Sequence, residues 1–136
     1  MQTIFPLLRY NHARAAIDWL TAAFGFRLLF LVPEQGEFVR HAQLVLGTNI
    51  IMVGSCRPDE GLSSPQSLGA ATQGLSVYIT SVAEHYEQAR SAGAEIVAAP
   101  YDTDFGSHEY IARDPEGHLW VFGNYCPVVP ADGPQD

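Results

Sequence analysis

Two residues of this sequence could act together as a general acid and a general base, His41 and Glu109. Each lies in a strand-like stretch, and the residues of a strand alternate between the two faces of a sheet. The apolar Ala42 and Leu44 are expected to face the helices, so His41 faces the opposite way, and Glu109 does so by the same reckoning. The two side chains could share an ion or exchange a proton, or they could be separate hydrogen-bonded surface groups.

The remaining histidines and the cysteines give weaker indications of chemistry. His12 lies at a predicted helix start, His85 on an exposed helix face and His118 just after a turn, so we expect solvated or capping roles for all three. Cys56 and Cys126 show no metal-ligand spacing and are too few for a disulfide framework. We expect both to be free thiols.

A turn and a strand are predicted in the stretch RDPEGHLWVFGNY, residues 113–125. Asp114 and Pro115 favour the opening of the turn and Gly117 its close. The stretch QSLGAATQG, residues 66–74, lacks the Lys and Thr of a phosphate loop and is interpreted as linker. The sequence has no nucleophile elbow and no recognisable triad, so no catalytic residue is assigned.

Composition restricts the classes of partner. With 136 residues and 47% hydrophobic content, the chain is expected to fold as one domain with a real core. The net charge is −8 with only seven Lys and Arg, which argues against nucleic acid as a partner. The sequence shows no long apolar run for a membrane span and no signal-peptide pattern, so we expect a cytoplasmic protein without a membrane partner.

An internal repeat organises the chain, and its first copy contains a helix within residues 11–26. Asn11 is the predicted N-cap and Gly25 the predicted stop. The predicted buried stripe consists of Ile17, Leu20 and Phe24. Trp19 lies beside this stripe, and core packing is the more plausible role for it.

A second helix of the same design is predicted within residues 81–96. Ser81 and Glu84 have the spacing of a capping box, and Gly93 follows the helix. The predicted buried stripe consists of Val82, Tyr86 and Ala89. The repeat therefore covers about half the chain in each copy.

Strand-like runs surround both helices, and the fold class follows from their order. They comprise residues 3–9, 27–32, 38–46, 49–53, 75–80, 95–98, 108–112 and 118–123. We therefore predict an α+β domain over residues 1–125, with two tandem βαβββ modules at about 1–54 and 74–125 that form a curled mixed sheet. A linker covers residues 55–73, and the proline-containing tail, residues 126–136, is expected to be irregular or to pack over a neighbouring surface.

The motifs of this repeat together resemble those of the vicinal oxygen chelate superfamily, which includes glyoxalase I, fosfomycin-resistance enzymes and bleomycin-resistance proteins. They are FGF at the end of the first helix, AGAEI at the end of the second, and DPEGH before the last strand, with HAQL and IMVG between them. The resemblance covers roughly residues 3–125 and implies the glyoxalase/bleomycin-resistance fold.

The resemblance also implies four positions for metal ligands. In metal-dependent members, a divalent ion is held by His, Gln or Glu from the first and last strands of each module. Here these positions are Phe5, Met52, Gly74 and Val121, which offer no hard or borderline donor. We therefore expect no metal and no other cofactor, although a displaced site involving His41 stays open as an alternative.

Strand alternation predicts a ligand pocket on the face away from the helices. Its predicted binding residues are Phe5, Arg9, His41, Gln43, Met52, Ser76, Tyr78, Glu109, Ile111, Arg113 and Val121, and Leu7, Ile50 and Leu119 share that face. Trp120 and Phe122 have the opposite orientation and should pack against the helices. The alternative is that the first set only fills a narrow sheet or a dimer interface.

Two functions of different class remain open at this point. The first is a protein that sequesters an aromatic or cationic small molecule, such as an antibiotic, without turnover. The second is a glyoxalase-like lyase or isomerase that uses His41 and Glu109 or a displaced metal. In either case the resemblance implies a homodimer, because the family typically closes such sheets across a two-fold axis.

Overall fold

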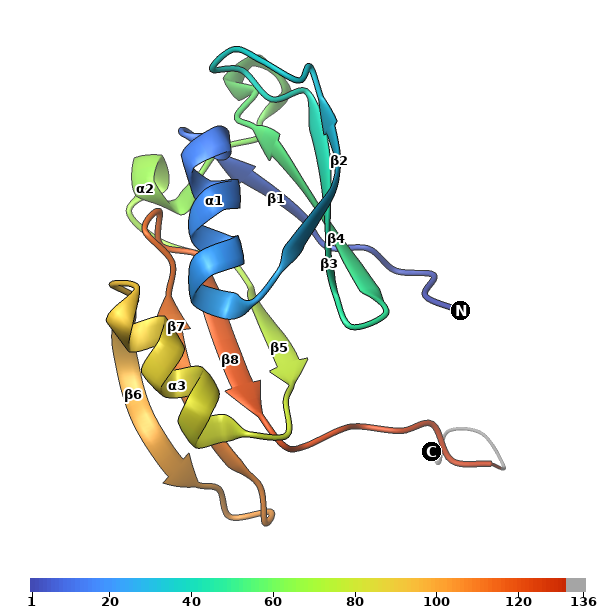
Figure 1. Ribbon diagram of the computed structural model, residues 1–136, viewed down its shortest axis with the longest axis vertical. Coiled ribbons are helices and arrows are strands. Elements are labelled where there is room, and N and C mark those ends of the chain that lie inside the picture. The colour runs from blue at the N-terminus through green and yellow to red at the C-terminus, as the bar shows by residue number, and fades with distance from the viewer. Residues whose placement is uncertain (132–136) are drawn as a thin grey trace.

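The computed structural model describes residues 1–131, which form an α+β fold with two four-stranded sheets (Figure 1). The elements of the first half are β1 Leu7–Tyr10, α1 Ala13–Phe24, β2 Arg27–Val32, β3 His41–Leu46 and β4 Asn49–Ser55. The connection contains the 3-10 helix η1 Pro58–Glu60 and the short helix α2 Pro65–Leu68. The second half contains β5 Gly74–Tyr78, α3 Val82–Ser91, β6 Glu95–Asp102, β7 His108–Arg113 and β8 Leu119–Gly123.

The two halves repeat one topology. The strand orders are β1-β4-β3-β2 and β5-β8-β7-β6. The pairs β1–β4 and β5–β8 are parallel, and the other neighbours are antiparallel. The βαβββ duplication predicted from the sequence is therefore confirmed, with each module forming a mixed sheet of its own.

Helix α1 covers the first sheet with the predicted stripe. Ile17, Leu20 and Phe24 are all buried. The helix ends at Gly25, whose φ of 84° lies in the left-handed region that favours glycine. The Trp19 indole donates to the carbonyl of Ala92 at 2.8 Å, which ties α1 to the end of α3.

The predicted N-cap of α1 is wrong, because the N-cap residue is His12 and not Asn11. The acceptor at this helix start comes from the other half of the chain. The Glu116 carboxylate accepts from the backbone N–H groups of Asn11 at 2.6 Å and His12 at 2.8 Å. Glu116 lies more than 100 residues along the chain from Asn11 and His12. No local sequence pattern could therefore have indicated this cap.

Helix α3 begins at the predicted N-cap Ser81, but the capping box does not form. The Ser81 side chain makes no capping hydrogen bond to a backbone N–H of the described residues. Glu84 lies in the first turn, where a negative charge stabilises a helix. The predicted stripe is confirmed at Val82 and Ala89, which are buried.

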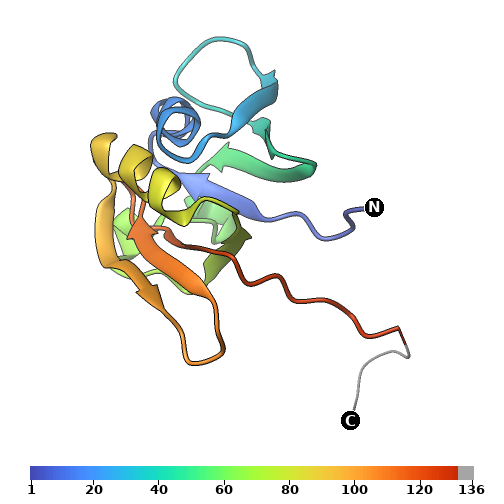
Figure 2. The ribbon, with the colours of Figure 1, turned by 60° about the horizontal axis from the view of Figure 1, so that its bottom comes forward.

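The hydrophobic core lies where the two helices meet and where they cover the sheets. Helices α1 and α3 lie side by side (Figure 2), and the largest buried side chains between them and the strands are Trp120, Tyr10, Tyr110, Phe24 and Phe122. The predicted helix-facing orientation of Trp120 and Phe122 is confirmed, since both are fully buried.

The DPEGH turn joins the halves through a second carboxylate, that of Asp114, which is buried. Its Oδ2 atom accepts from the Tyr10 hydroxyl at 2.6 Å and from the Trp120 indole at 3.1 Å. Burial, with the charge of Asp114 as a second cause, raises the pKa of Tyr10 well above its usual value. Tyr10 therefore stays a hydrogen-bond donor, and Asp114 fixes β1 against β8.

Two of the predicted solvent-facing histidines lie inside this contact region. His118 Nε2 lies 2.8 Å from the carbonyl oxygen of Arg9, so the residue connects the halves. His85 is partly buried, with Nδ1 at 2.5 Å from the Tyr110 hydroxyl and Nε2 at 3.2 Å from the Phe24 carbonyl. The exposed-face prediction for His85 is therefore wrong, because α1 covers the side of α3 that carries it.

Several strand boundaries differ from the prediction, most of all those of β1 and β6, and β3 begins at His41 and not at residue 38. Strand β1 begins at Leu7 and not at residue 3, because Pro6 has no N–H to donate. Before it, the Gln2 side chain takes the place of a strand partner for Ile50. It accepts from the Ile50 N–H at 2.7 Å and donates to the Ile50 carbonyl at 2.8 Å. Strand β6 continues past residue 98 to Asp102, since its position at the sheet edge tolerates Pro100.

Both ends of the described chain extend away from the sheets (Figure 1). Residues 126–131 are exposed and without helix or strand. The prediction for residues 132–136 lies outside the described residues. Cys56 is half-buried and Cys126 exposed, and both are free thiols as expected.

Candidate functional site

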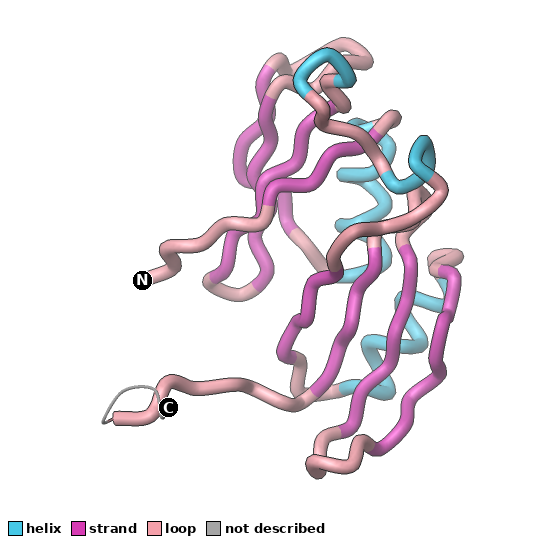
Figure 3. The backbone as a smooth tube through the Cα atoms, turned by 180° about the vertical axis from the view of Figure 1, so that it is seen from behind, coloured by secondary structure: helices cyan, strands magenta, loops and turns pink. Residues whose placement is uncertain are grey.

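The two sheets have one face covered by helices and one face that is open (Figure 3). We call the face of each sheet opposite the helices the N-terminal open face and the C-terminal open face. Residues that alternate with the buried core positions lie there and are half-buried or exposed. The predicted binding residues are distributed as follows: Arg9, His41, Gln43 and Met52 on the N-terminal open face, and Ser76, Tyr78, Glu109, Ile111, Arg113 and Val121 on the C-terminal open face. Phe5 precedes β1 and is 38% exposed.

The N-terminal open face combines apolar side chains with a few polar groups. His41 Nε2 lies 3.1 Å from Gln43 Nε2, and the His41 ring lies 6.1 Å from that of Phe30. Leu7 is 46% and Phe30 47% exposed, so large apolar side chains remain in contact with solvent on this face. Such a surface can accept a flat apolar group with a small number of oriented polar contacts.

Arg9 supplies the positive charge of this face. It pairs with Gly54 on the neighbouring strand, and a Cβ atom at residue 54 would lie 2.8 Å from Arg9 Nη1. The glycine therefore leaves the space in which the guanidinium lies. Nη1 donates to the carbonyl of Ser55 at 3.2 Å, whereas Nε is buried without a hydrogen-bond partner among the described residues.

The C-terminal open face carries a negative charge at the equivalent level. Glu109 pairs with Gly123, where a Cβ atom would lie only 2.6 Å from the Glu109 Cβ. The Tyr101 hydroxyl donates to Glu109 Oε1 at 2.7 Å, and this hydrogen bond is the main cause that raises the pKa of Tyr101. Tyr101 was missed in the sequence because the strand that carries it was predicted to end before Pro100.

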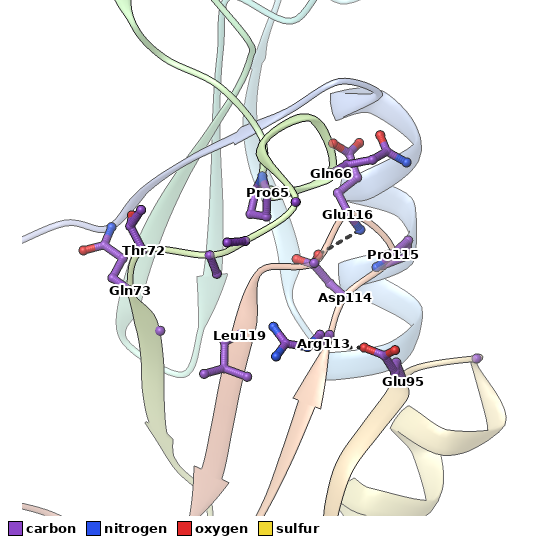
Figure 4. Close-up of a pocket in the computed structure, with 16 residues that line it drawn as sticks. Pro65, Gln66, Thr72, Gln73, Glu95, Arg113, Asp114, Pro115, Glu116 and Leu119 are labelled. Carbon is purple, nitrogen blue, oxygen red and sulfur yellow. Dashed lines mark hydrogen bonds and ion pairs between the residues drawn. The ribbon is translucent and has the colours of Figure 1, made fainter.

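A cavity of about 930 Å³ lies at the other end of this face, between the connecting segment 65–74 and the DPEGH turn (Figure 4). Leu119 and Arg113 form part of its wall, and Figure 4 shows the Arg113 guanidinium between Leu119 and Glu95. Arg113 Nε lies 3.4 Å from Glu95 Oε2. Pro65 and Gln73 also line the cavity.

His41 and Glu109, the proposed acid and base, are not brought together within one chain. His41 lies on β3 of the first sheet with Gln43 as its partner, and Glu109 lies on β7 of the second sheet with Tyr101 as its partner. Proton exchange between them has no direct path here. In the structure, His41 and Glu109 are separate groups, each with its own hydrogen-bond partner.

The sequence profile of the Glyoxalase/Bleomycin resistance protein/Dioxygenase superfamily matches residues 4–122. The chain belongs to this superfamily. A similar solved structure is TioX from Micromonospora sp. ML1, with 34% sequence identity, a TM-score of 0.74, and coverage of 93% of this chain and 100% of that chain.

Other known proteins are similar at lower identity. The uncharacterized protein Rv0887c of Mycobacterium tuberculosis (strain ATCC 25618 / H37Rv) is 31% identical over 121 residues, which cover 87% of this chain and 71% of that protein. A glyoxalase/bleomycin resistance protein/dioxygenase family enzyme from Burkholderia phytofirmans PsJN is 18% identical, with a TM-score of 0.65 over 88% of this chain and 94% of that chain. This last likeness shows the shared fold alone.

The residues at the superfamily's metal positions do not fit a divalent ion. Register places Val121 beside Ser76 on β5, two residues after Gly74, and Met52 beside Leu7 on β1. Phe5, Gly74 and Val121 have no side-chain lone pair to offer an ion. The thioether of Met52 is a soft ligand unsuited to zinc, nickel or manganese. Within residues 1–131, no three His, Cys, Asp or Glu side chains come together as a metal-binding group. Within the same described range, no helix is long and apolar enough to cross a membrane.

Proposed function

We propose that this superfamily member binds an aromatic or cationic small molecule, such as an antibiotic, on its open sheet faces and sequesters it without turnover. The observation that carries this proposal is the composition of the open faces. Partly exposed apolar side chains such as Leu7, Phe30 and Val121 lie there together with polar and charged groups such as Arg9, His41 and Glu109. Surfaces of this composition are typical of small-molecule sites, in which apolar area provides affinity and a few polar groups provide orientation.

The donor chemistry supports binding over metal-assisted catalysis. The four positions that would hold the ion carry no suitable ligand atom, and His41 is separated from Glu109 by its place in the other sheet. The buried carboxylates Asp114 and Glu116 are engaged with donors from β1, α1 and the connecting segment. These acidic groups hold the two halves of the chain together.

The binding unit in this proposal is a homodimer. The open faces leave large apolar side chains in contact with solvent, among them Leu7, Phe30 and Tyr78. Apolar surface of this kind is stabilised by contact with a second copy of the chain. Light scattering at micromolar concentration is expected to give twice the chain mass, and a monomer at that concentration and above contradicts the dimer.

A thermal-shift screen with antibiotics and carbonyl compounds tests the binding proposal. A ligand at about 100 times its Kd adds roughly 2.7 kcal/mol to the free energy of unfolding, which a melting experiment resolves easily. We expect Val121→Trp, which fills the C-terminal open face, to remove the shift. Val128→Trp is the matched control, because Val128 is 81% exposed in the tail, and it should keep the shift. A screen without any stabilising compound, or equal shifts in both variants, refutes the proposal.

A further inference from the structure

Four residues form one row across the C-terminal open face. Strand β8 lies between β5 and β7, and Gly123 on β8 pairs with Tyr78 on one side and Glu109 on the other. Tyr101 on β6 pairs with Glu109 from the far side. The order across the sheet is therefore tyrosine, glycine, glutamate, tyrosine.

The glycine in this row sets the position of the carboxylate. A Cβ atom at residue 123 would lie 2.6 Å from the Glu109 Cβ and 3.3 Å from its Oε2 atom, so the side chain of Glu109 occupies the space above Gly123. The Oε2 atom therefore lies close to Gly123 on β8, on the side of Glu109 away from β6. The Tyr101 hydroxyl holds Oε1 at 2.7 Å, and among the described residues no hydrogen bond is made to Oε2.

The charge of this carboxylate is not compensated within the described chain. None of the ion pairs among residues 1–131 involves Glu109, and Arg113, four residues further along β7, is paired with Glu95 at 3.4 Å. The chain as a whole carries a net charge of −8, which further favours cations near its surface. Tyr78 and Tyr101 are 52% and 36% exposed, so their rings are accessible on either side of the carboxylate.

The geometry points to an organic ammonium site, in which the Glu109 carboxylate above Gly123 pairs with the cationic nitrogen of a ligand and the rings of Tyr78 and Tyr101 flank it. A carboxylate provides a charge-assisted contact, and aromatic faces attract substituted ammonium groups through their quadrupoles. This inference rests on the proposed function and makes it more specific, because it names the charge class of the ligand and adds Tyr101 and Gly123 to the site.

The test uses choline and its neutral carbon analogue 3,3-dimethyl-1-butanol as probes of the full chain. They have the same shape and differ in charge. Binding is followed by the amide NMR shifts of Tyr101 and Gly123. We expect choline to bind roughly tenfold more tightly than the neutral probe. Glu109→Gln should remove this preference while the melting temperature stays close to that of the wild type.

Two glycine variants provide a matched comparison. Gly123→Ala places a methyl group against Glu109 and should weaken choline binding severalfold. Gly54→Ala makes the same change at the equivalent position of the N-terminal open face, against Arg9, and should leave choline binding unchanged. Tyr101→Phe keeps the ring, loses the hydrogen bond to Glu109, and should give an intermediate loss.

Three results overturn the inference. Equal affinity for the two probes does so, and so does a choline preference that survives Glu109→Gln. A change of solution mass in Glu109→Gln without a change in choline affinity would assign Glu109 to contacts between copies and also contradicts it. If compounds from the thermal-shift screen bind in spite of any of these results, only the ammonium site fails. If no compound binds at all, the proposed function fails and the ammonium site fails with it.

Discussion

The carboxylate of Glu116 should be one of the largest single contributors to stability outside the apolar core. It is 5% exposed and accepts three hydrogen bonds, from the Ser64 hydroxyl at 2.6 Å and from the backbone N–H groups of Asn11 and His12. Glu116→Ala removes all three at once. Because the partners come from the start of α1 and from the connecting segment, the variant loosens the contact between the two halves.

The size of the loss follows from the burial of the three donors. Leaving the buried Ser64 hydroxyl without this acceptor costs about 1–3 kcal/mol. Losing the cap of the two N–H groups at the helix start costs about 0.5–2 kcal/mol, since solvent can partly replace it. We therefore expect a loss of about 3 kcal/mol in the free energy of unfolding for Glu116→Ala, and about half of that for Glu116→Gln, which keeps one oxygen acceptor.

Urea unfolding followed by tryptophan fluorescence measures this loss at one protein concentration. With a typical urea dependence of 1–3 kcal/mol per M, a 3 kcal/mol loss lowers the midpoint by about 1–3 M. Glu34→Ala is the matched control, because it removes the same charge from an exposed position and should change stability by less than about 0.5 kcal/mol. If Glu116→Ala shifts the midpoint no more than Glu34→Ala does, the account of the contact between the halves is refuted.

Three further predictions concern the core, pH and metal. Trp120→Ala should cost roughly 3–5 kcal/mol in urea unfolding because the ring is fully buried, and a loss below about 1 kcal/mol would mean that the face assignment is wrong. Burial lowers the pKa of His85 below its usual 6.5, so the unfolded chain binds more protons there than the folded one, and stability is lost as pH falls from about 6.5. His85→Gln cannot titrate, so urea midpoints measured between pH 7.5 and pH 5 should fall less for it than for the wild type, and parallel curves would exclude His85 as the cause. The purified protein should contain no stoichiometric zinc, nickel or manganese, and chelators should leave its melting temperature unchanged; one tightly bound ion per chain, lost together with stability, would contradict this.

The sequence was sufficient for the fold because the fold depends on repeated local patterns. The apolar stripe of α1, the alternation around Ala42 and Leu44, and the hairpin at Gly47 all report structure within a few residues. Each of these features is present as predicted. The two βαβββ halves follow from them without knowledge of any long-range contact.

The sequence was insufficient where a side chain finds its partner far along the chain. Glu116 caps a helix more than 100 residues earlier in the chain, whereas the local sequence pattern favours Asn11 as the N-cap. His85 was placed on a solvent-facing side because the sequence does not show that α1 packs against α3. The same limit applies to the open faces, where alternation identified Glu109 but could not show that Tyr101 holds its carboxylate.

The most direct test of the central claim is to measure the fate of a bound ligand. The wild-type protein is incubated with the best compound from the thermal-shift screen, denatured, and the compound is quantified by mass spectrometry. Sequestration predicts that the compound is recovered with its mass unchanged and in the amount added. Formation of product at more than one equivalent per chain, abolished in His41→Ala, would contradict sequestration and establish the protein as an enzyme.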